Sequence, residues 1–380
     1  MQSRIGRIDN PIEIPTYTLV DAFCGSGGLS LGLEQAGFET KLAFDTNPIA
    51  VESYRRNISS IACVIDITHP SMEDVSSSLR QTGVDLIAGG PPCQGFSKQK
   101  RGAHLGDSRN ALVREYAKFV RGIKPRFFLL ENVDQLGQKR GIELVKIVEE
   151  ILEDYDLIPH FYNAANYGVA QARRRFIIVG KRKSIKSEFR IPNPTIQKWI
   201  TIRDAIGDLP EPPDDFTEHP NYPNHYRTNI TKLNIERFSH VPQGGGWWNI
   251  PEHLRLECHK NVDVTSGGWP DVYGRLEWEG QAPTITAGFD SFTRGRYGHP
   301  ESNRAITPRE AARLQGFPDD FTFLGNRGDI RLQIGNAVPP PLAKAIGDEI
   351  LKTLMVEDGY IEKDIRIGSQ NSFIIQPSLF

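Results

Sequence analysis

Short apolar runs alternate with amphipathic stretches along the first half of the chain. Runs that are typical of buried strands occupy residues 17–21, 41–45, 84–88, 126–130 and 176–180. Apolar side chains recur at helical spacing between them, in residues 29–36, 50–56, 111–123 and 144–152. Strands that alternate with helices are typical of a sheet covered on both faces, so the pattern predicts a doubly wound α/β domain over residues 15–182.

The alternation then stops. Residues 185–283 are rich in Pro, Gly, Trp, His and Asn and show no sustained period, which predicts a smaller, irregular β-rich domain whose loops serve recognition. Helical sequence returns at Thr307-Pro-Arg-Glu310, a capping box with Pro in the first turn, and a last helix is predicted over 341–356. We therefore expect residues 1–184 plus 284–380 to form one discontinuous catalytic domain and 185–283 the second domain.

Composition narrows the class of protein. With 380 residues, 38% of them hydrophobic, the chain can bury a substantial core, and disorder throughout is excluded. The four cysteines, at positions 24, 63, 93 and 258, are too widely spaced for a disulfide framework or a zinc site, so no metal is expected. No apolar stretch reaches the roughly 18 residues of a membrane span, and the N-terminus lacks a signal-peptide core. We expect a cytoplasmic protein without a membrane partner.

Net charge does not by itself indicate a nucleic-acid partner, because the formal value is −2. The distribution is more informative, since basic residues gather at 98–101, 173–175 and 181–186 while acidic residues gather at 149–156 and 204–215. This pattern indicates a basic working face, although charge runs are also typical of ordinary solvated surface.

A glycine-rich turn follows the first predicted strand. Phe23-Cys-Gly25-Ser-Gly27-Gly28 opens the first helix, and its glycines allow the backbone to approach a ligand closely, although the spacing is not GxGxxG. Asp45 ends the second strand, where a carboxylate can accept ribose hydroxyls. Asp66 and Ile67, at the end of the next candidate strand, offer an acceptor and an apolar wall for adenine. These features predict a nucleoside site, with a structural glycine turn as the alternative.

Cys93 lies in Gly89-Gly-Pro-Pro-Cys-Gln-Gly-Phe-Ser97, directly after the third main strand. A free cysteine is usually a small buried hydrophobe, but the rigid prolines and permissive glycines beside Cys93 favour a reactive thiol. Glu131 follows the strand 126–130, and Gln171-Ala-Arg-Arg-Arg175 precedes the strand 176–180. In isolation the carboxylate could cap a helix and the arginines could be solvated. Together with a thiol beside a nucleoside site, they predict an active site.

With these motifs in this order, the chain resembles the cytosine-5 DNA methyltransferases, and in particular the bacterial modification methylases. The resemblance covers residues 17–182 and about 284–350. It rests on Asp21-Ala-Phe-Cys-Gly-Ser-Gly-Gly28, Gly90-Pro-Pro-Cys-Gln94, Glu131-Asn-Val133, Gln171-Ala-Arg-Arg-Arg175, Arg313-Leu-Gln-Gly-Phe-Pro318 and Gly335-Asn-Ala-Val338. One small departure is Ala22, where the family usually has Leu.

The resemblance implies S-adenosylmethionine as the methyl donor and no metal. Phe23 would lie against the adenine, Asp45 on the ribose, and Asp66 and Ile67 around the adenine edge. The remainder of the pocket would be formed by Gly25, Gly27, Gly28, Pro92, Leu112 and Asn336.

The resemblance also implies the chemistry. Carbon 5 of cytosine is a poor nucleophile until a thiolate adds to C6, and Cys93 would be that nucleophile. Glu131 would bind the N3/N4 edge of the base, and Arg173 and Arg175 would hold O2 and the backbone. The target base would be flipped out of the duplex. Gln94, Ser97 and Arg109 would position the loop and the DNA phosphates, and residues 95–107 are expected to form a mobile lid.

Residues 185–283 fall where the family varies and reads its target, so specific double-stranded DNA is the expected partner. Candidates for base contacts there are Arg237, Trp247, Trp248 and Arg275. We expect a monomeric bacterial enzyme that protects host DNA in a restriction-modification system. A tRNA cytosine-5 methyltransferase is the main alternative, and a non-catalytic nucleic-acid binder and a nicotinamide-dependent oxidoreductase are weaker ones, the last because GxGxxG is missing.

Overall fold

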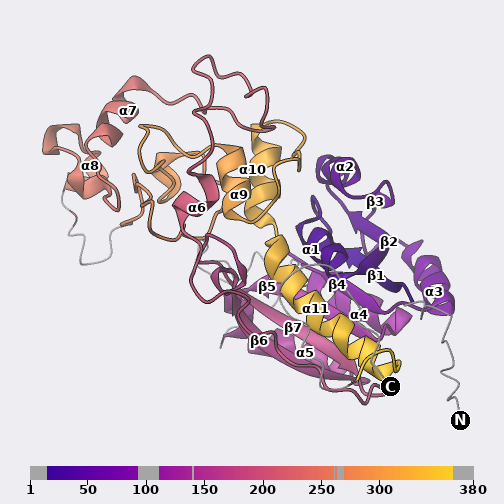
Figure 1. The fold of residues 1–380 in the computed structure, drawn as a ribbon. Coiled ribbons are helices and arrows are strands. Elements are labelled where there is room, and N and C mark those ends of the chain that lie inside the picture. The colour runs from indigo at the N-terminus through magenta and orange to yellow at the C-terminus, as the bar shows by residue number, and fades with distance from the viewer. Residues whose placement is uncertain (1–14, 93–110, 139–140, 261, 263–268, 363–380) are drawn as a thin grey trace, which may run out of the picture.

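The computed structural model describes residues 15–92, 111–138, 141–260, 262 and 269–362. A sheet covered by helices forms one part, and a lobe built from residues after the sheet forms the other (Figure 1). Among the helices of these described residues, none is long and apolar enough to cross a membrane.

The sheet has seven strands in the order β3-β2-β1-β4-β5-β7-β6. The first five strands in the chain run parallel, whereas β7 runs antiparallel to both β5 and β6. This topology confirms the predicted α/β class. The bounds are β1 Tyr17–Ala22, β2 Phe38–Asp45, β3 Ala62–Val64, β4 Leu86–Gly89, β5 Phe127–Val133, β6 Tyr155–Asn163 and β7 Arg174–Arg182.

Helices cover the sheet on both faces. Successive strand residues point to opposite sides, so that Phe127 joins one hydrophobic core and Phe128 the other. The first core is closed by α1 (Gly28–Ala36) and α11 (Pro340–Glu357), which pack together across one face. The other face is covered by α3 (Met72–Thr82), α4 (Ala111–Ile123) and α5 (Ile142–Ile151), while α2 (Pro48–Asn57) lies beside β2 and β3.

Most predicted elements are present with bounds that differ by a few residues, and α4 coincides with its prediction. Two elements of the sheet and its covering helices, α3 and β6, were not predicted. In α3 the apolar residues Met72, Val75 and Leu79 stand at helical spacing, but only Met72 is fully buried and the remaining residues are polar, so this short period was overlooked. β6 is the edge strand of the sheet and is exposed along much of its length, and its sequence is correspondingly mixed.

The prediction of a β-rich second domain is wrong for the described residues of 185–283. They contain short helices and isolated bridges but no strand. The lobe's helices are α6 (Ile202–Ile206), α7 (Lys232–Ser239), α8 (Glu257–Lys260), α9 (Pro308–Leu314) and α10 (Arg327–Asn336). Single 3-10 turns occur at Asp134–Gly137, Ala164–Tyr167, Trp247–Asn249, Glu252–Leu254 and Phe292–Arg294.

Hydrophobic packing in the lobe crosses the boundary expected at residue 284. One core joins Ile202 of α6 to Leu314 of α9 and Ile334 of α10. A second, smaller core gathers Phe238, Trp247 and other residues around α7 and α8, at the end of the lobe that lies away from the sheet (Figure 1). Of the helices after residue 284, it is α11 that packs onto the sheet.

A buried ion pair fixes the start of α9. Thr307 and Glu310 form the predicted capping box, and Arg304 donates to Glu310 Oε1 and Oε2 at 2.7 and 2.8 Å. Glu310 is 1% exposed. Burial alone would raise the pKa of Glu310, but the adjacent Arg304 guanidinium lowers it to about 2.

We predict that Glu310→Gln lowers the free energy of unfolding by about 2–3 kcal/mol at pH 7, because it removes the fully buried carboxylate partner of Arg304 and leaves only the half-exposed Glu211. A carboxyl with a depressed pKa stabilises the fold above its unfolded pKa of about 4.3 and loses that effect as pH falls toward 2. Urea unfolding at pH 7 and pH 4 should therefore show a smaller difference between wild type and mutant at the lower pH.

Asp348→Asn is the matched control. Asp348 pairs with Lys344 on the surface of α11 at 2.8 Å, with both side chains more than 40% exposed. Exposed pairs contribute at most about 1 kcal/mol. Equal losses from the two mutations would contradict the role given to the buried pair.

Candidate active site

The predicted site residues gather at one edge of the sheet. β1, β2, β4 and β5 end at this edge, and β7 begins there, because Arg175 lies opposite Val133 in the antiparallel pairing of β7 with β5. Segments that are far apart in the sequence therefore meet where the parallel strands end, which is the usual ligand position in such sheets.

The loop after β1 has an unusual backbone. Phe23, Gly25 and Gly27 have φ values of 62°, 53° and 99°, in the left-handed region. For a side chain as large as that of Phe23 this conformation costs about 1–2 kcal/mol, so surrounding contacts must hold it in place. One such contact is the hydrogen bond from the Gly25 amide to Asp45 Oδ2, at 2.9 Å.

The glycines have distinct surroundings. A Cβ on Gly25 would meet no atom within 4 Å, so the loop is open at this point. A Cβ on Gly28 would lie 2.5 Å from the carbonyl oxygen of Val338, so Gly28 permits close contact between α1 and the segment that follows α10. The loop therefore combines an open side with a tightly packed side.

Two buried polar atoms of this loop region lack a hydrogen-bond partner among the described residues. They are Asp21 Oδ1 and Ser26 Oγ. The other carboxylate oxygen of Asp21 accepts a hydrogen bond from Ser30 at 2.6 Å. Burial raises the pKa of Asp21 to about 7. Buried polar atoms without partners are rare in folded proteins, and a bound ligand, ion or water is a common explanation for them.

Asp45 and Asp66 lie where the sequence predicted them. Asp45 is the last residue of β2 and also accepts from the Asn47 amide at 2.8 Å, while Asp66 lies just beyond β3. Asp66 is exposed, and hydrogen bonds from the Thr68 amide and hydroxyl lower its pKa. Ile67 is buried in the core below.

The loop that leads to Cys93 is anchored at its base. The Asn132 side chain donates to the carbonyl oxygen of Pro91 at 2.9 Å. Pro92 is exposed at the edge of the described residues. Asn132 was not predicted to have a role, although it stands within the Glu131-Asn-Val133 motif. Four predicted residues lie outside the described residues: Cys93, Gln94, Ser97 and Arg109.

Glu131 and Arg175 form an ion pair directly beside this loop. Arg175 Nε lies 2.8 Å from Glu131 Oε1, and the two side chains are 12% and 11% exposed. Burial lowers the pKa of Arg175, and the neighbouring Glu131 carboxylate opposes that shift. The pair thus presents a fixed acceptor and a fixed donor at the sheet edge.

Arg173 occupies a different position from the one predicted. It is fully buried, and its guanidinium donates to the backbone oxygens of Ile285, Gly335 and Ala337 at 3.0, 3.0 and 2.8 Å. A guanidinium engaged in this way does not face a base. The expectation that Arg173 contacts the target nucleotide is therefore wrong in this structure, and Arg173 instead holds backbone together.

Leu112 and Asn336 are the remaining described residues that were predicted to line the methyl-donor pocket. Leu112, near the start of α4, is partly buried against the core of that face. Asn336 is the last residue of α10 and is exposed. It stands between the two carbonyl groups that Arg173 binds, those of Gly335 and Ala337.

Two of the candidates for reading DNA bases are structural. Arg275 is 4% exposed and donates to backbone oxygens of five residues, among them Phe238 and His299, and Trp247 is 1% exposed. Burial of these side chains excludes direct base contact in this conformation, so both expectations are wrong here. Trp269, which was not among the candidates, is 78% exposed.

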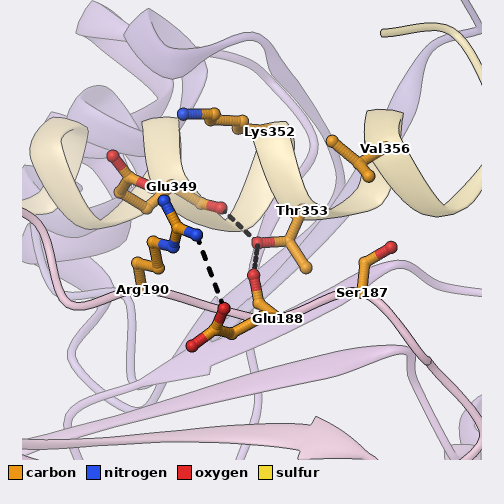
Figure 2. Close-up of a pocket in the computed structure, with 7 residues that line it drawn as sticks. All are labelled: Ser187, Glu188, Arg190, Glu349, Lys352, Thr353 and Val356. Carbon is orange, nitrogen blue, oxygen red and sulfur yellow. Dashed lines mark hydrogen bonds and ion pairs between the residues drawn. The ribbon is translucent and has the colours of Figure 1, made fainter. Parts of the chain in front are cut away.

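Figure 2 shows a pocket elsewhere, between the chain at Ser187–Arg190 and the later turns of α11. Within it, Arg190 lies 3.6 Å from Glu188. Just beyond it, Asp358 binds Arg126 and Tyr17 where β5 and β1 begin, so this pocket lies toward the opposite edge of the sheet.

Comparison with known proteins agrees with this geometry. The family model for the C-5 cytosine-specific DNA methylases matches residues 17–352. The Type II methyltransferase M1.HphI of Haemophilus parahaemolyticus is 35% identical over 344 residues, which cover 89% of this chain and 87% of that protein. M.PspPI of Psychrobacter sp. (strain TA137) is 36% identical over 346 residues, 89% and 80% of the two chains.

Solved structures give the same result. A prophage-encoded Escherichia coli protein, described as a candidate DNA modification methyltransferase, superposes with a TM-score of 0.69 at 26% identity, over 89% of this chain and 99% of that one. The chain therefore belongs to the C-5 cytosine-specific DNA methylase family and is a DNA cytosine-5 methyltransferase.

Proposed function

We propose that this enzyme transfers a methyl group from S-adenosylmethionine to C5 of a flipped-out cytosine in a specific double-stranded sequence, with Cys93 as the nucleophile. The observation that carries the proposal is the buried Glu131–Arg175 pair beside the anchored Pro91-Pro92 turn. Similarity to Type II methyltransferases supports a role in protecting host DNA within a restriction-modification system.

The residues after β1 fit the methyl donor. The open side of Gly25 leaves room for a ligand, and Asp21 and Ser26 have buried polar atoms without partners among the described residues. Asp45 and Asp66 would take the ribose and the adenine edge, Ile67 and Phe23 the faces of the ring, and Gly27, Gly28, Pro92, Leu112 and Asn336 the remaining walls. When bound, the donor supplies an electrophilic methyl group. No metal is part of the proposal.

Glu131 and Arg175 would hold the flipped base. The carboxylate can accept from the N4 amino group and from a protonated N3, and the guanidinium can donate to O2. Both groups are fixed before the base arrives, so little reorganisation is needed when charge moves into the ring. Unstacking the base costs a few kcal/mol, which these contacts would offset.

Cys93 would form a covalent bond to the base and break it again at the end of the reaction. The thiolate forms a bond to C6, and the electron pair of the C5–C6 double bond makes C5 nucleophilic. C5 then takes the methyl group, the bond between that methyl group and the donor sulfur breaks, and S-adenosylhomocysteine is the leaving group. A water or hydroxide then removes the C5 proton, the double bond reforms, and the thiolate leaves. Gln94, Ser97 and Arg109 would position the loop and the DNA phosphates.

Double-stranded DNA is proposed rather than a tRNA because a recognition segment of about a hundred residues, 185–283, lies between the catalytic motifs. Target reading then falls to the exposed side chains of the lobe, including Arg237 and Trp248 of the original candidates, which are partly exposed. Bisulfite sequencing of plasmid from cells that express the chain would test activity and sequence context together.

Cys93→Ser should abolish methyl transfer and leave S-adenosylmethionine affinity within about twofold, because the thiol acts on the base and the serine hydroxyl is a far weaker nucleophile. Filter-based methylation assays and isothermal titration with the donor would measure the two quantities.

DNA with 5-fluorocytosine at the target should trap the wild-type enzyme through Cys93, since fluorine blocks loss of the C5 substituent. Normal turnover by the mutant, or an adduct on another cysteine, would overturn the mechanism.

Glu131→Gln should lower kcat by about 10²–10³-fold, since it removes the acceptor that stabilises charge moving into the ring. Donor affinity should be nearly unchanged because Glu131 is paired with Arg175 rather than with the glycine loop. Single-turnover kinetics on saturating DNA would give the rate, and thermal unfolding would show whether the unpaired Arg175 costs stability. A kcat within threefold of wild type would remove Glu131 from the mechanism.

Recognition can be tested by exchanging the end of the lobe. Residues 231–272 contain α7 and α8 and contribute Phe238, Val241, Trp247 and Ile250 to the small core, whereas the core shared with α9 lies outside them. Replacing 231–272 with the equivalent segment of a related methyltransferase should change the methylated sequence, because each base contact contributes about 1–3 kcal/mol of discrimination. An active chimera that kept the original target would assign recognition elsewhere.

A further inference from the structure

Three backbone carbonyl groups from separate parts of the chain converge on one guanidinium. Arg173 Nη1 donates to Ile285 and Nη2 donates to Gly335 and Ala337. Ile285 lies in the lobe segment that precedes α9. The other two residues flank Asn336 at the end of α10. One side chain therefore joins the start of β7 to two lobe segments.

Two of the carbonyl groups held by Arg173, those of Gly335 and Ala337, flank Asn336, which the proposed function places in the wall of the donor site. Val338, directly after this turn, contacts Gly28 so closely that a Cβ there would lie 2.5 Å from the Val338 oxygen. Gly335 packs against the backbone of Ala287, where a Cβ would lie 2.4 Å from the amide nitrogen. The glycine loop, the turn at Asn336 and the segment at Ile285 thus form one tightly packed unit with little freedom to shift separately.

Arg173 is also next to the base-binding pair. It stands one residue before β7 begins, and its carbonyl oxygen accepts from Ala164 at 2.9 Å. Arg175, the second residue of β7, carries the ion pair with Glu131. A displacement of the Arg173 backbone is therefore transmitted along two residues of a paired strand to Arg175.

Gln171 strengthens the same junction. Its amide nitrogen donates to Leu314 and its amide oxygen accepts from the Ile285 amide at 2.8 Å. Arg173 and Gln171 together bind both the amide and the carbonyl group of Ile285. The segment before β7 is thereby fixed to the lobe at two points.

We propose that Arg173 is a positioning residue that couples the methyl-donor site to the Glu131–Arg175 pair, so that donor binding restrains the groups that hold the base. The coupling rests on the proposed function, since it takes the turn at Asn336 as part of the donor site. It acts through hydrogen bonds to backbone, and Arg173 itself touches neither the donor nor the base.

A buried arginine that only stabilises the fold would produce some of the same effects, and the chain offers a matched control. Arg309 is also fully buried and donates to three backbone oxygens, those of Pro223, Pro318 and Phe321. These acceptors belong to segments other than β7 and the turn at Asn336. Arg173→Lys and Arg309→Lys each replace a planar fork by a single ammonium group that cannot span all three acceptors.

The first measurement compares the two lysine variants by calorimetric titration with S-adenosylmethionine and by single-turnover methylation. Both variants should lose thermal stability. Arg173→Lys should weaken donor binding about tenfold and lower the single-turnover rate at saturating donor and DNA, whereas Arg309→Lys should change each by less than twofold. Equal effects of both variants, or unchanged donor affinity in Arg173→Lys, would overturn the coupling.

The second measurement uses the wild-type enzyme and does not depend on whether a variant folds. Hydrogen exchange is followed with and without S-adenosylhomocysteine, in the absence of DNA. Bound ligand should slow exchange by at least threefold at amides 176–178 of β7 and 285–287, and leave the amides near Arg309 unchanged. Protection confined to the glycine loop and the ends of β2 and β3 would overturn the coupling, whereas no binding at all would count against the proposed function.

Discussion

The active site depends on one strand that runs against the others. β1, β2, β4 and β5 bring their last residues to the ligand edge of the sheet, and β7 brings its first residues there because it is antiparallel to β5. In this register Arg175 lies opposite Val133. A parallel β7 of the same nine residues would place Arg175 about 20 Å away, near the other edge. The ion pair with Glu131 exists only because of this direction.

In the lobe, buried arginine side chains donate hydrogen bonds to backbone carbonyl groups, as neighbouring strands do in the sheet. The lobe's irregular backbone leaves carbonyl groups that need donors, and a guanidinium offers five N–H groups in a fixed fork. Arg275 and Arg309 are used in this way, and burial lowers the pKa of each to about 10. Burying a charge is costly, but each one here satisfies several carbonyl groups at once. The lobe is therefore held by hydrogen bonds from side chains as well as by its apolar cores.

The sheet is stabilised by continuous apolar cores and the lobe largely by side-chain hydrogen bonds, and this difference explains which predictions from the sequence succeeded. Periodicity found α4 and the central strands because their apolar residues face a continuous core, and local capping rules found the start of α9. α3 and β6 were missed, because α3 has only three apolar residues at helical spacing among polar ones and the edge strand β6 has a mixed sequence. The composition of residues 185–283, rich in Trp, Gly and Pro, was interpreted as that of a β-rich domain. In the described part of this segment it belongs to turns whose carbonyl groups accept hydrogen bonds from arginine side chains. Residue type alone could not show that Arg173 faces carbonyl groups while Arg175 faces a carboxylate.

Pairing Glu131 with Arg175 limits how the carboxylate can act. Its Oε1 atom is engaged by Arg175, so Oε2 is the oxygen with more room for a new partner. A Cβ at Gly90 would lie 3.1 Å from this Oε2 atom, close enough to obstruct a ligand that approaches it. Glycine at position 90 therefore keeps the carboxylate accessible from the side on which the Pro91-Pro92 turn begins. In the proposed function, this is the side from which a cytosine would approach the Oε2 atom of Glu131.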